Sequence, residues 1–205
     1  MDIQGMNILG YDYILFWIPC LYLNINQMMN FRQQLAKFVT GNITTDQLPM
    51  VGMKGLEQGL DSSSLRILAG LGKDENPFVI EHYFNLALEE LKIEFPDRRQ
   101  AAIEYSDAII EEIFRGGKDI ITGINEIINS IGSYDFLSES LNYCYDSIGF
   151  EKLYGLFDTY NELLVADKPW QPNKTNNELI EDVKIQLEIE LRKWKKRIIR
   201  MRKEE

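Results

Sequence analysis

The chain has 205 residues, of which 45% are hydrophobic and 26% charged, and this composition is typical of a folded globular protein. Its 32 acidic and 22 basic residues give a formal net charge of −10. One histidine and two cysteines are too few for a histidine-rich zinc site or a disulfide framework, and no nucleotide-binding P-loop motif is present. We therefore expect no resident metal, no cofactor and no enzymatic activity. The cysteine usage predicts a reducing compartment, the cytoplasm.

The charge is distributed unevenly along the chain. Residues 1–190 hold 30 acidic and only 14 basic residues, a net charge of −16. A body this acidic repels nucleic acid and anionic membranes and attracts basic partners. The remaining eight basic residues lie near the C-terminus: Arg192, Lys193, Lys195, Lys196, Arg197, Arg200, Arg202 and Lys203.

The first 27 residues differ from the rest of the chain. The stretch from Ile8 to Ile25 is strongly apolar, but Asp12 interrupts it, and the run that follows is shorter than the roughly 20 residues that span a bilayer. The first basic residue is Arg32, so the basic start of a secretory signal is missing. We expect residues 1–27 to be an accessory segment without a stable membrane span, a membrane-associated segment being the alternative. Residues 28–205 would then form a single helical domain.

Beyond this segment, apolar residues recur at helical spacing, and Gly or Pro residues separate the runs. A first helix is predicted to end near Gly41, with one apolar face formed by Phe31, Leu35 and Phe38. Thr44 and Gln47 have the spacing of a capping box and predict a second helix that runs to about Gly59.

Three consecutive serines, Ser62 to Ser64, raise the question of a catalytic nucleophile. A nucleophile elbow has the pattern G-x-S-x-G after a strand, and neither feature is present here. The lone His82 is expected to be a packed structural residue rather than a catalytic base. We therefore interpret Asp61 or Ser62 as the N-cap of a helix that ends at Gly70.

Three further helices are predicted between Pro77 and Ile131. The one that starts at Pro77 is apolar over much of its circumference and should lie near the centre of a bundle. The next starts after Asp97 and carries an external Glu111–Arg115 pair at i,i+4 spacing. The third follows Gly116 and Gly117. The sequences around Gly41 and Gly116 are similar, which suggests a repeated helical hairpin.

The clearest helix is the last one. Residues 166–177 form a polar, Pro-bearing connector, and Thr175 and Glu178 form a capping box for a long helix over residues 175–203. This helix is predicted to dock along the body or to pair with a second copy in a homodimer through an apolar seam: Ile180, Val183, Leu187, Leu191, Trp194, Ile198 and Met201. No run alternates with the period of a strand. The fold class is therefore predicted to be all-α, an antiparallel helical bundle or a short array of helical hairpins.

The most unusual stretch for function is residues 134–162, which contains five of the ten tyrosines and six acidic residues against one lysine. Tyrosine buries a large area at low entropic cost, and surrounding carboxylates favour a basic partner. We predict partner-binding residues here: Tyr134, Asp135, Glu139, Tyr143, Tyr145, Asp146 and Asp158. The alternative is that the tyrosines belong to the core and the acids to a solvated face.

Two other functions remain as alternatives. The basic run Arg192–Lys203 can follow the phosphates of a nucleic acid, with Trp194 stacking on a base, or it can serve a scaffold or adaptor role. Cationic side chains also suit the C-terminal end of a helix, where they complement the helix dipole. A hydrolase that uses two carboxylates is a second alternative, because any acidic chain offers such pairs.

Several stretches resemble small bacterial helical proteins that accompany toxin genes and are similar to immunity proteins. The likeness covers roughly residues 35–130 and rests on GLDSSSLRILAGL, a Pro-started helix ending ALEEL, FPDRRQAAIEY and IFRGGKDIITGINEI. The resemblance implies a protein that neutralises a cognate toxin by stoichiometric occlusion. It implies no functional residues. A basic toxin, such as a nuclease, would suit the acidic body.

Overall fold

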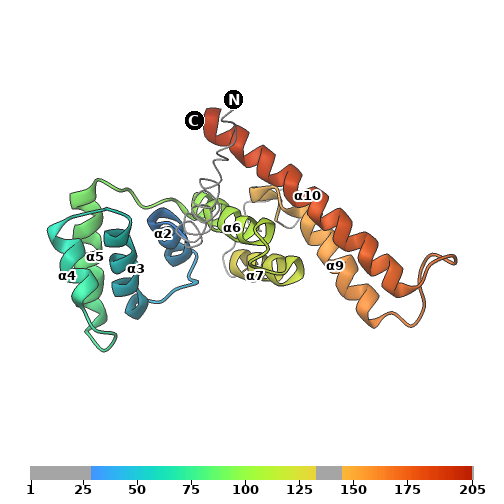
Figure 1. Ribbon diagram of the computed structural model, residues 1–205, viewed down its shortest axis with the longest axis horizontal. Coiled ribbons are helices and arrows are strands. Elements are labelled where there is room, and N and C mark those ends of the chain that lie inside the picture. The colour runs from blue at the N-terminus through green and yellow to red at the C-terminus, as the bar shows by residue number, and fades with distance from the viewer. Residues whose placement is uncertain (1–28, 133–144, 205) are drawn as a thin grey trace, which may run out of the picture.

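The computed structural model is all-α, as predicted (Figure 1). It describes residues 29–132 and 145–204, and over these ranges it contains eight α-helices, two short 3-10 helices and no strand. The predicted accessory segment, residues 1–27, lies outside the described ranges.

The first half of the described chain encloses one hydrophobic cluster. Its elements are α2 (Phe31–Val39), the 3-10 helix η1 (Thr45–Gln47), α3 (Leu48–Glu57), α4 (Ser63–Gly70) and α5 (Pro77–Leu91). Helix α3 packs on α4, and α4 packs on α5, so consecutive helices form hairpins. Their inward faces share ten buried residues: Phe31, Leu35, Leu48, Val51, Leu65, Leu68, Ile80, Phe84, Ala87 and Leu88.

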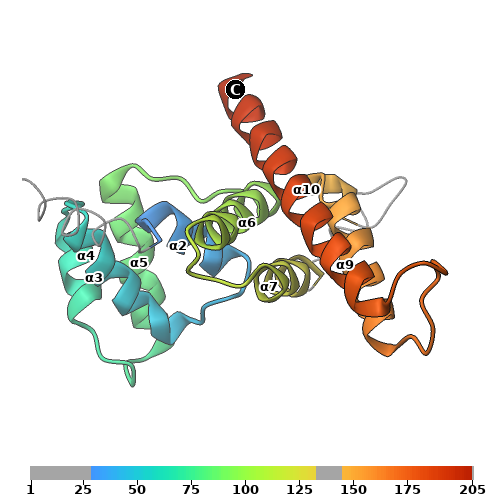
Figure 2. The same cartoon turned by 45° about the vertical axis from the view of Figure 1, so that its right-hand side comes forward.

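The second half encloses a larger cluster. Its elements are α6 (Arg98–Phe114), α7 (Ile120–Gly132), the 3-10 helix η2 (Asp146–Ile148), α9 (Glu151–Val165) and α10 (Asn176–Glu204). Helices α9 and α10 form a long hairpin at one end of the molecule, while α2 and α6 lie between the two halves (Figure 1 and Figure 2). Helix α2 joins the halves, because Phe31 and Leu35 belong to the first cluster and Ala36 belongs to the second.

The central helix is α6, not α5 as the sequence suggested. All ten residues from Ala101 to Ile110 are buried, and α2, α7, α10 and η2 all contact this helix. Helix α5 instead packs only on α3, α4 and η1 among its main neighbours and leaves Phe78 80% exposed. His82, which was expected to be packed, is exposed. The apolar face of α5 is therefore wider than the part of this helix that neighbouring helices cover.

The predicted helix starts are confirmed in most cases. Ser62 Oγ accepts a hydrogen bond from the Leu65 amide at 3.2 Å, so the serine run begins α4. Glu178 Oε2 accepts from the Thr175 amide at 2.7 Å, which completes the predicted box before α10. The Thr44 box also forms, but it opens the 3-10 turn η1, and α3 begins only at Leu48.

The apolar seam of α10 docks on the chain's own core. Leu179, Val183, Leu187, Leu191, Trp194 and Ile198 are buried, whereas Ile180 is only half-buried, so the seam starts one residue earlier than predicted. The Trp194 indole donates to the Ile148 carbonyl at 2.8 Å. Because α9, α6 and α7 contact this helix, its buried seam docks along the body, the first of the two predicted arrangements. A homodimer through the rest of the helix stays a prediction.

Close packing between α6 and α7 depends on Gly123. A Cβ at this position would lie 2.5 Å from Ile113 Cδ1 and 3.2 Å from Ile109 Cγ2. We expect Gly123→Val to lower the free energy of unfolding by about 1–2 kcal/mol, because overpacking a core forces side chains from their rotamers. The measurement is urea unfolding followed by circular dichroism.

Gly155 provides the control, because a Cβ added at this position inside α9 would meet no atom of another element within 4 Å. Gly155→Ala should raise the free energy of unfolding by about 0.5–1 kcal/mol, since glycine is a poor helix former. If Gly123→Val unfolds like the wild type, the close approach of α6 and α7 is incorrect.

Candidate partner-binding site

Four of the seven predicted partner-binding residues, Tyr134, Asp135, Glu139 and Tyr143, lie outside the described residues. Of the others, Asp146 starts η2, and Asp158 is exposed on α9. Tyr145 is only 8% exposed and belongs to the core. It therefore offers no surface to a partner in this conformation.

The described tyrosines of the predicted segment all pack against the second cluster. The Tyr145 and Tyr154 ring centroids are 4.7 Å apart, and Tyr160 stacks on Phe157 at 6.3 Å. In contrast, Asp158 and the neighbouring Glu162 are exposed. For this part of the segment, the structure therefore agrees with the alternative of core tyrosines beneath an acidic face.

An exposed apolar group lies next to this acidic face, and the sequence analysis missed it. Leu164 and Val165 end α9, Trp170 lies in the connector, and all three are more than half exposed. We call Leu164, Val165 and Trp170 the hairpin tip. Its only sequence signal is that the apolar run at the end of α9 extends past the core-facing Leu163.

Carboxylates of the buried helix α6 bind cations from the helices around it. Glu104 Oε1 accepts from Arg32 Nε of α2 at 2.9 Å. On another side, Lys195 Nζ of α10 lies 2.7 Å from Asp107 Oδ1 and 2.8 Å from Glu111 Oε1. Because Glu104 and Asp107 are themselves buried, these contacts compensate for charges that water does not reach.

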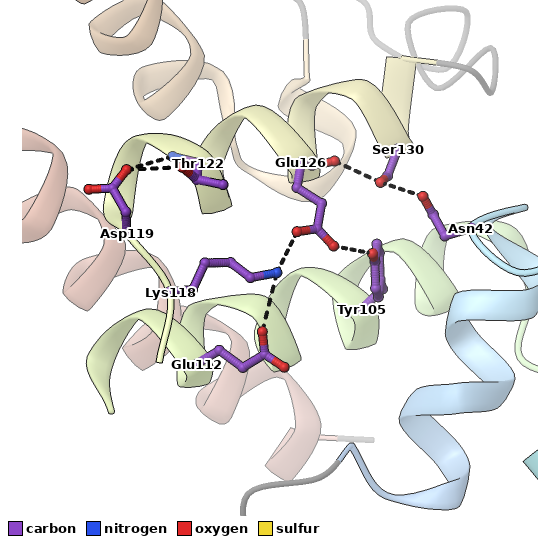
Figure 3. A network of polar contacts seen from close by, with 8 residues as sticks. All are labelled: Asn42, Tyr105, Glu112, Lys118, Asp119, Thr122, Glu126 and Ser130. Atoms are coloured by element: carbon purple, nitrogen blue, oxygen red, sulfur yellow. Dashed lines mark hydrogen bonds and ion pairs between the residues drawn. The ribbon is translucent and has the colours of Figure 1, made fainter. Parts of the chain in front are cut away.

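A second polar network joins α6 to α7 (Figure 3). The Tyr105 hydroxyl donates to Glu126 Oε1 at 2.6 Å, and Lys118 bridges Glu126 and Glu112, the latter at 3.2 Å. Burial raises the pKa of Tyr105, and the Glu126 carboxylate raises it further. Burial alone would lower the pKa of Lys118, but the two carboxylates raise it above its usual value. The phenol and the ammonium thus hold their protons at neutral pH, which favours a structural role over nucleophilic or general-base chemistry.

The basic run near the C-terminus is partly engaged within the chain. Lys195 binds α6, and Lys193 pairs with Glu190 at 2.7 Å. Arg192 pairs with Glu188 at 2.6 Å and lies over the Phe114 ring at 4.7 Å. Trp194 is fully buried, so it cannot stack on a base as the nucleic-acid alternative requires.

A groove of about 400 Å³ separates the α6–α7 corner from α10. Its apolar lining comes from Ile113, Phe114, Ile120 and Ile185, and its cations are Lys118, Lys184 and Arg192. Each of these cations contacts a carboxylate of the same chain. The groove therefore presents no unpaired charge that would select a ligand.

In residues 29–132 and 145–204, no three His, Cys, Asp or Glu side chains are grouped so that they could hold a metal ion. Within the same ranges, no helix has both the length and the apolar character that a membrane crossing requires. Comparisons with protein-family models, curated proteins and solved structures found no match to this chain.

The Lys195 contacts should contribute to stability. In Lys195→Ala, the buried Asp107 carboxylate loses this cation, so we expect the free energy of unfolding to fall by about 2–4 kcal/mol. Lys193→Ala is the control on the same helix, because it removes an i,i+3 pair whose lysine is largely exposed, and it should cost less than about 1 kcal/mol. Equal losses in the two variants, measured by denaturant unfolding, would show that the Lys195 contacts stabilise no more than a surface pair.

The α6–α7 network predicts a dependence of stability on pH. Burial alone would raise the pKa of Glu126, but hydrogen bonds from Lys118 and Tyr105 outweigh burial and hold it below the usual 4.5. This depressed pKa stabilises the folded state. The stabilisation is complete at pH values above the pKa of the carboxyl in the unfolded chain, and it is lost as the pH falls through the lower pKa of the folded state. From about pH 6 to about pH 3, the unfolding free energy of Glu126→Gln should therefore decline less than that of the wild type.

Glu162→Gln is the control for this pH series, since its carboxylate is exposed on α9. Its profile should follow the wild type. A Glu126→Gln profile with the full wild-type decline would mean that Glu126 does not couple folding to protonation.

Proposed function

We propose that this protein is a non-enzymatic acidic binding protein that neutralises a basic protein partner by covering its functional surface. In its specific form, the proposal is a cytoplasmic immunity protein that binds a cognate bacterial toxin with one-to-one stoichiometry. The observation that carries the proposal is the division of the carboxylates between an interior set and a surface set.

The interior set consists of the α6 carboxylates, of which Glu104 and Asp107 are buried, and these carboxylates pair with Arg32, Lys118 and Lys195. Cations engaged in these pairs do not offset the carboxylates that are exposed elsewhere on the surface. Asp158, Glu162 and many acids of the first half remain exposed. A surface of this kind accelerates encounter with a cationic protein and discriminates against nucleic acid.

The described contacts also support binding over catalysis. Lys118, which lines the groove, and Tyr105, which shares the Glu126 carboxylate with it, are held by carboxylates in their protonated forms (Figure 3). A binding protein needs no reactive group, whereas it does need a surface of defined shape. The resemblance to immunity proteins agrees with this division of roles.

The first test is association with the product of the neighbouring gene, purified together with this protein. If the acidic face of α9 steers the encounter, Asp158→Asn with Glu162→Gln should slow association by about three- to tenfold at low ionic strength, with a smaller effect at high salt. Stopped-flow fluorescence measures this rate. Asp74→Asn with Glu75→Gln removes the same charge from the α4–α5 loop and should slow association less.

Equal slowing by the two charge-matched variants would show that net charge, rather than the α9 face, attracts the partner. Alanine substitutions at Asp135, Tyr143 and Asp146 test the rest of the predicted surface. If Tyr143 anchors the interface, its substitution should weaken binding by about 2 kcal/mol or more. If no neighbouring product binds at all, the immunity proposal is wrong.

A further inference from the structure

The hairpin tip exposes more apolar surface than the fold requires. Leu163 points into the core and is 2% exposed, but the next two residues, Leu164 and Val165, are 56% and 83% exposed. Trp170 follows in the connector and is 53% exposed. Single exposed apolar residues are common, whereas three within seven positions at one end of a hairpin indicate a contact surface.

Side-chain contacts fix both ends of the connector, next to Val165 and before α10. The Asn176 amide donates to the Ala166 carbonyl at 2.7 Å, directly beyond the end of α9. Lys174 forms an ion pair with Asp182 on α10, and Thr175 caps the same helix through Glu178. A partner would therefore meet a preformed tip and would lose little conformational entropy in ordering it.

The charges around the tip select among partners. Asp158, Glu162 and Asp167 are exposed near it, against Lys168 and Lys174, of which Lys174 is already paired with Asp182. Anionic lipid and nucleic acid would be repelled by this excess of carboxylates. A protein surface that carries Lys and Arg around an apolar recess is complementary to the tip in its charge and in its apolar character.

We propose that the hairpin tip is the docking surface for a basic protein, with Val165 and Trp170 filling an apolar recess and the flanking carboxylates facing its cations. This inference rests on the proposed function and names the surface that performs it. Tryptophan is a frequent anchor of such interfaces, and a few residues commonly carry most of the binding energy.

The test that does not depend on a known partner is selection of a random-peptide phage library against the wild-type protein. Enriched peptides should combine Lys or Arg with aromatic or aliphatic residues. Synthetic copies should bind Val165→Ser/Trp170→Ala at least about tenfold more weakly than the wild type. Phe78→Ala, an exposed apolar residue on α5, is the control and should bind as the wild type does. Circular dichroism confirms that each variant is folded.

Three outcomes would overturn the inference. If the selected peptides bind the double variant as tightly as the wild type, the docking surface lies elsewhere. If the selected peptides contain no basic residues, the proposed selectivity for positive charge is wrong. A blue shift of Trp170 fluorescence on addition of phosphatidylcholine vesicles, lost in Trp170→Phe, would assign the tip to a membrane surface instead.

The neighbouring-gene product separates the two proposals. If it binds the wild type and the double variant equally, the tip is not the docking surface, although the proposed function stands. If it does not bind while the selected peptides require the tip, the tip remains a binding surface and the immunity function is wrong.

Discussion

The rest of the structure depends on the burial of the middle of α6, where every residue from Ala101 to Ile110 is buried. The carboxylates of Glu104 and Asp107 in this stretch are withdrawn from water, so each needs a cation or a donor supplied by a neighbour. Arg32 comes from α2, Lys195 from α10, and the Lys118–Glu126 pair from the α6–α7 turn and α7. These contacts fix the positions of three different elements around one axis. Small residues such as Ala101 and Ala108 allow those elements to approach it closely.

The same constraint explains the uneven charge along the sequence. Three of the basic residues near the C-terminus are engaged within the chain, because Lys195 binds α6 while Lys193 and Arg192 pair along α10 itself. Trp194 lies among them because the helix must also supply a large apolar group, which packs edge-on to Phe150 at 5.9 Å. Within this part of the helix, cations and apolar residues alternate because one side faces α6 and η2 and the other faces water.

Local patterns could be predicted from the sequence, and packing partners could not. Caps depend on a few adjacent residues, so Ser62 and Thr175 were predictable. The helical period shows how much of a helix is apolar but not what covers it, which is why α5 was placed at the centre in place of α6. Burial of Tyr145 depends on Ile128 and Tyr154, and the exposure of Val165 depends on where α9 ends, so neither site feature could be predicted. The sequences around Gly41 and Gly116 share a helix ending, in which an amide bonds to the carbonyl five residues back: Asn42 to Lys37 and Gly117 to Glu112. Helices α3 and α5 end in the same way, at Leu60 and Ile93. Because this ending is common to several helices, it does not test the repeated hairpin, which stays a prediction.

Rigidity links this interior to the proposed role. An inhibitor that works by occlusion gains most affinity from a surface that is already formed, because ordering side chains and loops on binding consumes free energy. The α6 contacts hold α10 against the body, and α10 in turn carries Asn176, whose amide fixes the end of α9. The position of the hairpin tip is thus tied, through one helix, to the buried carboxylates at the centre. These contacts hold the hairpin tip and the acidic face of α9 in one arrangement, which is what the proposed stoichiometric binding of a basic protein would require.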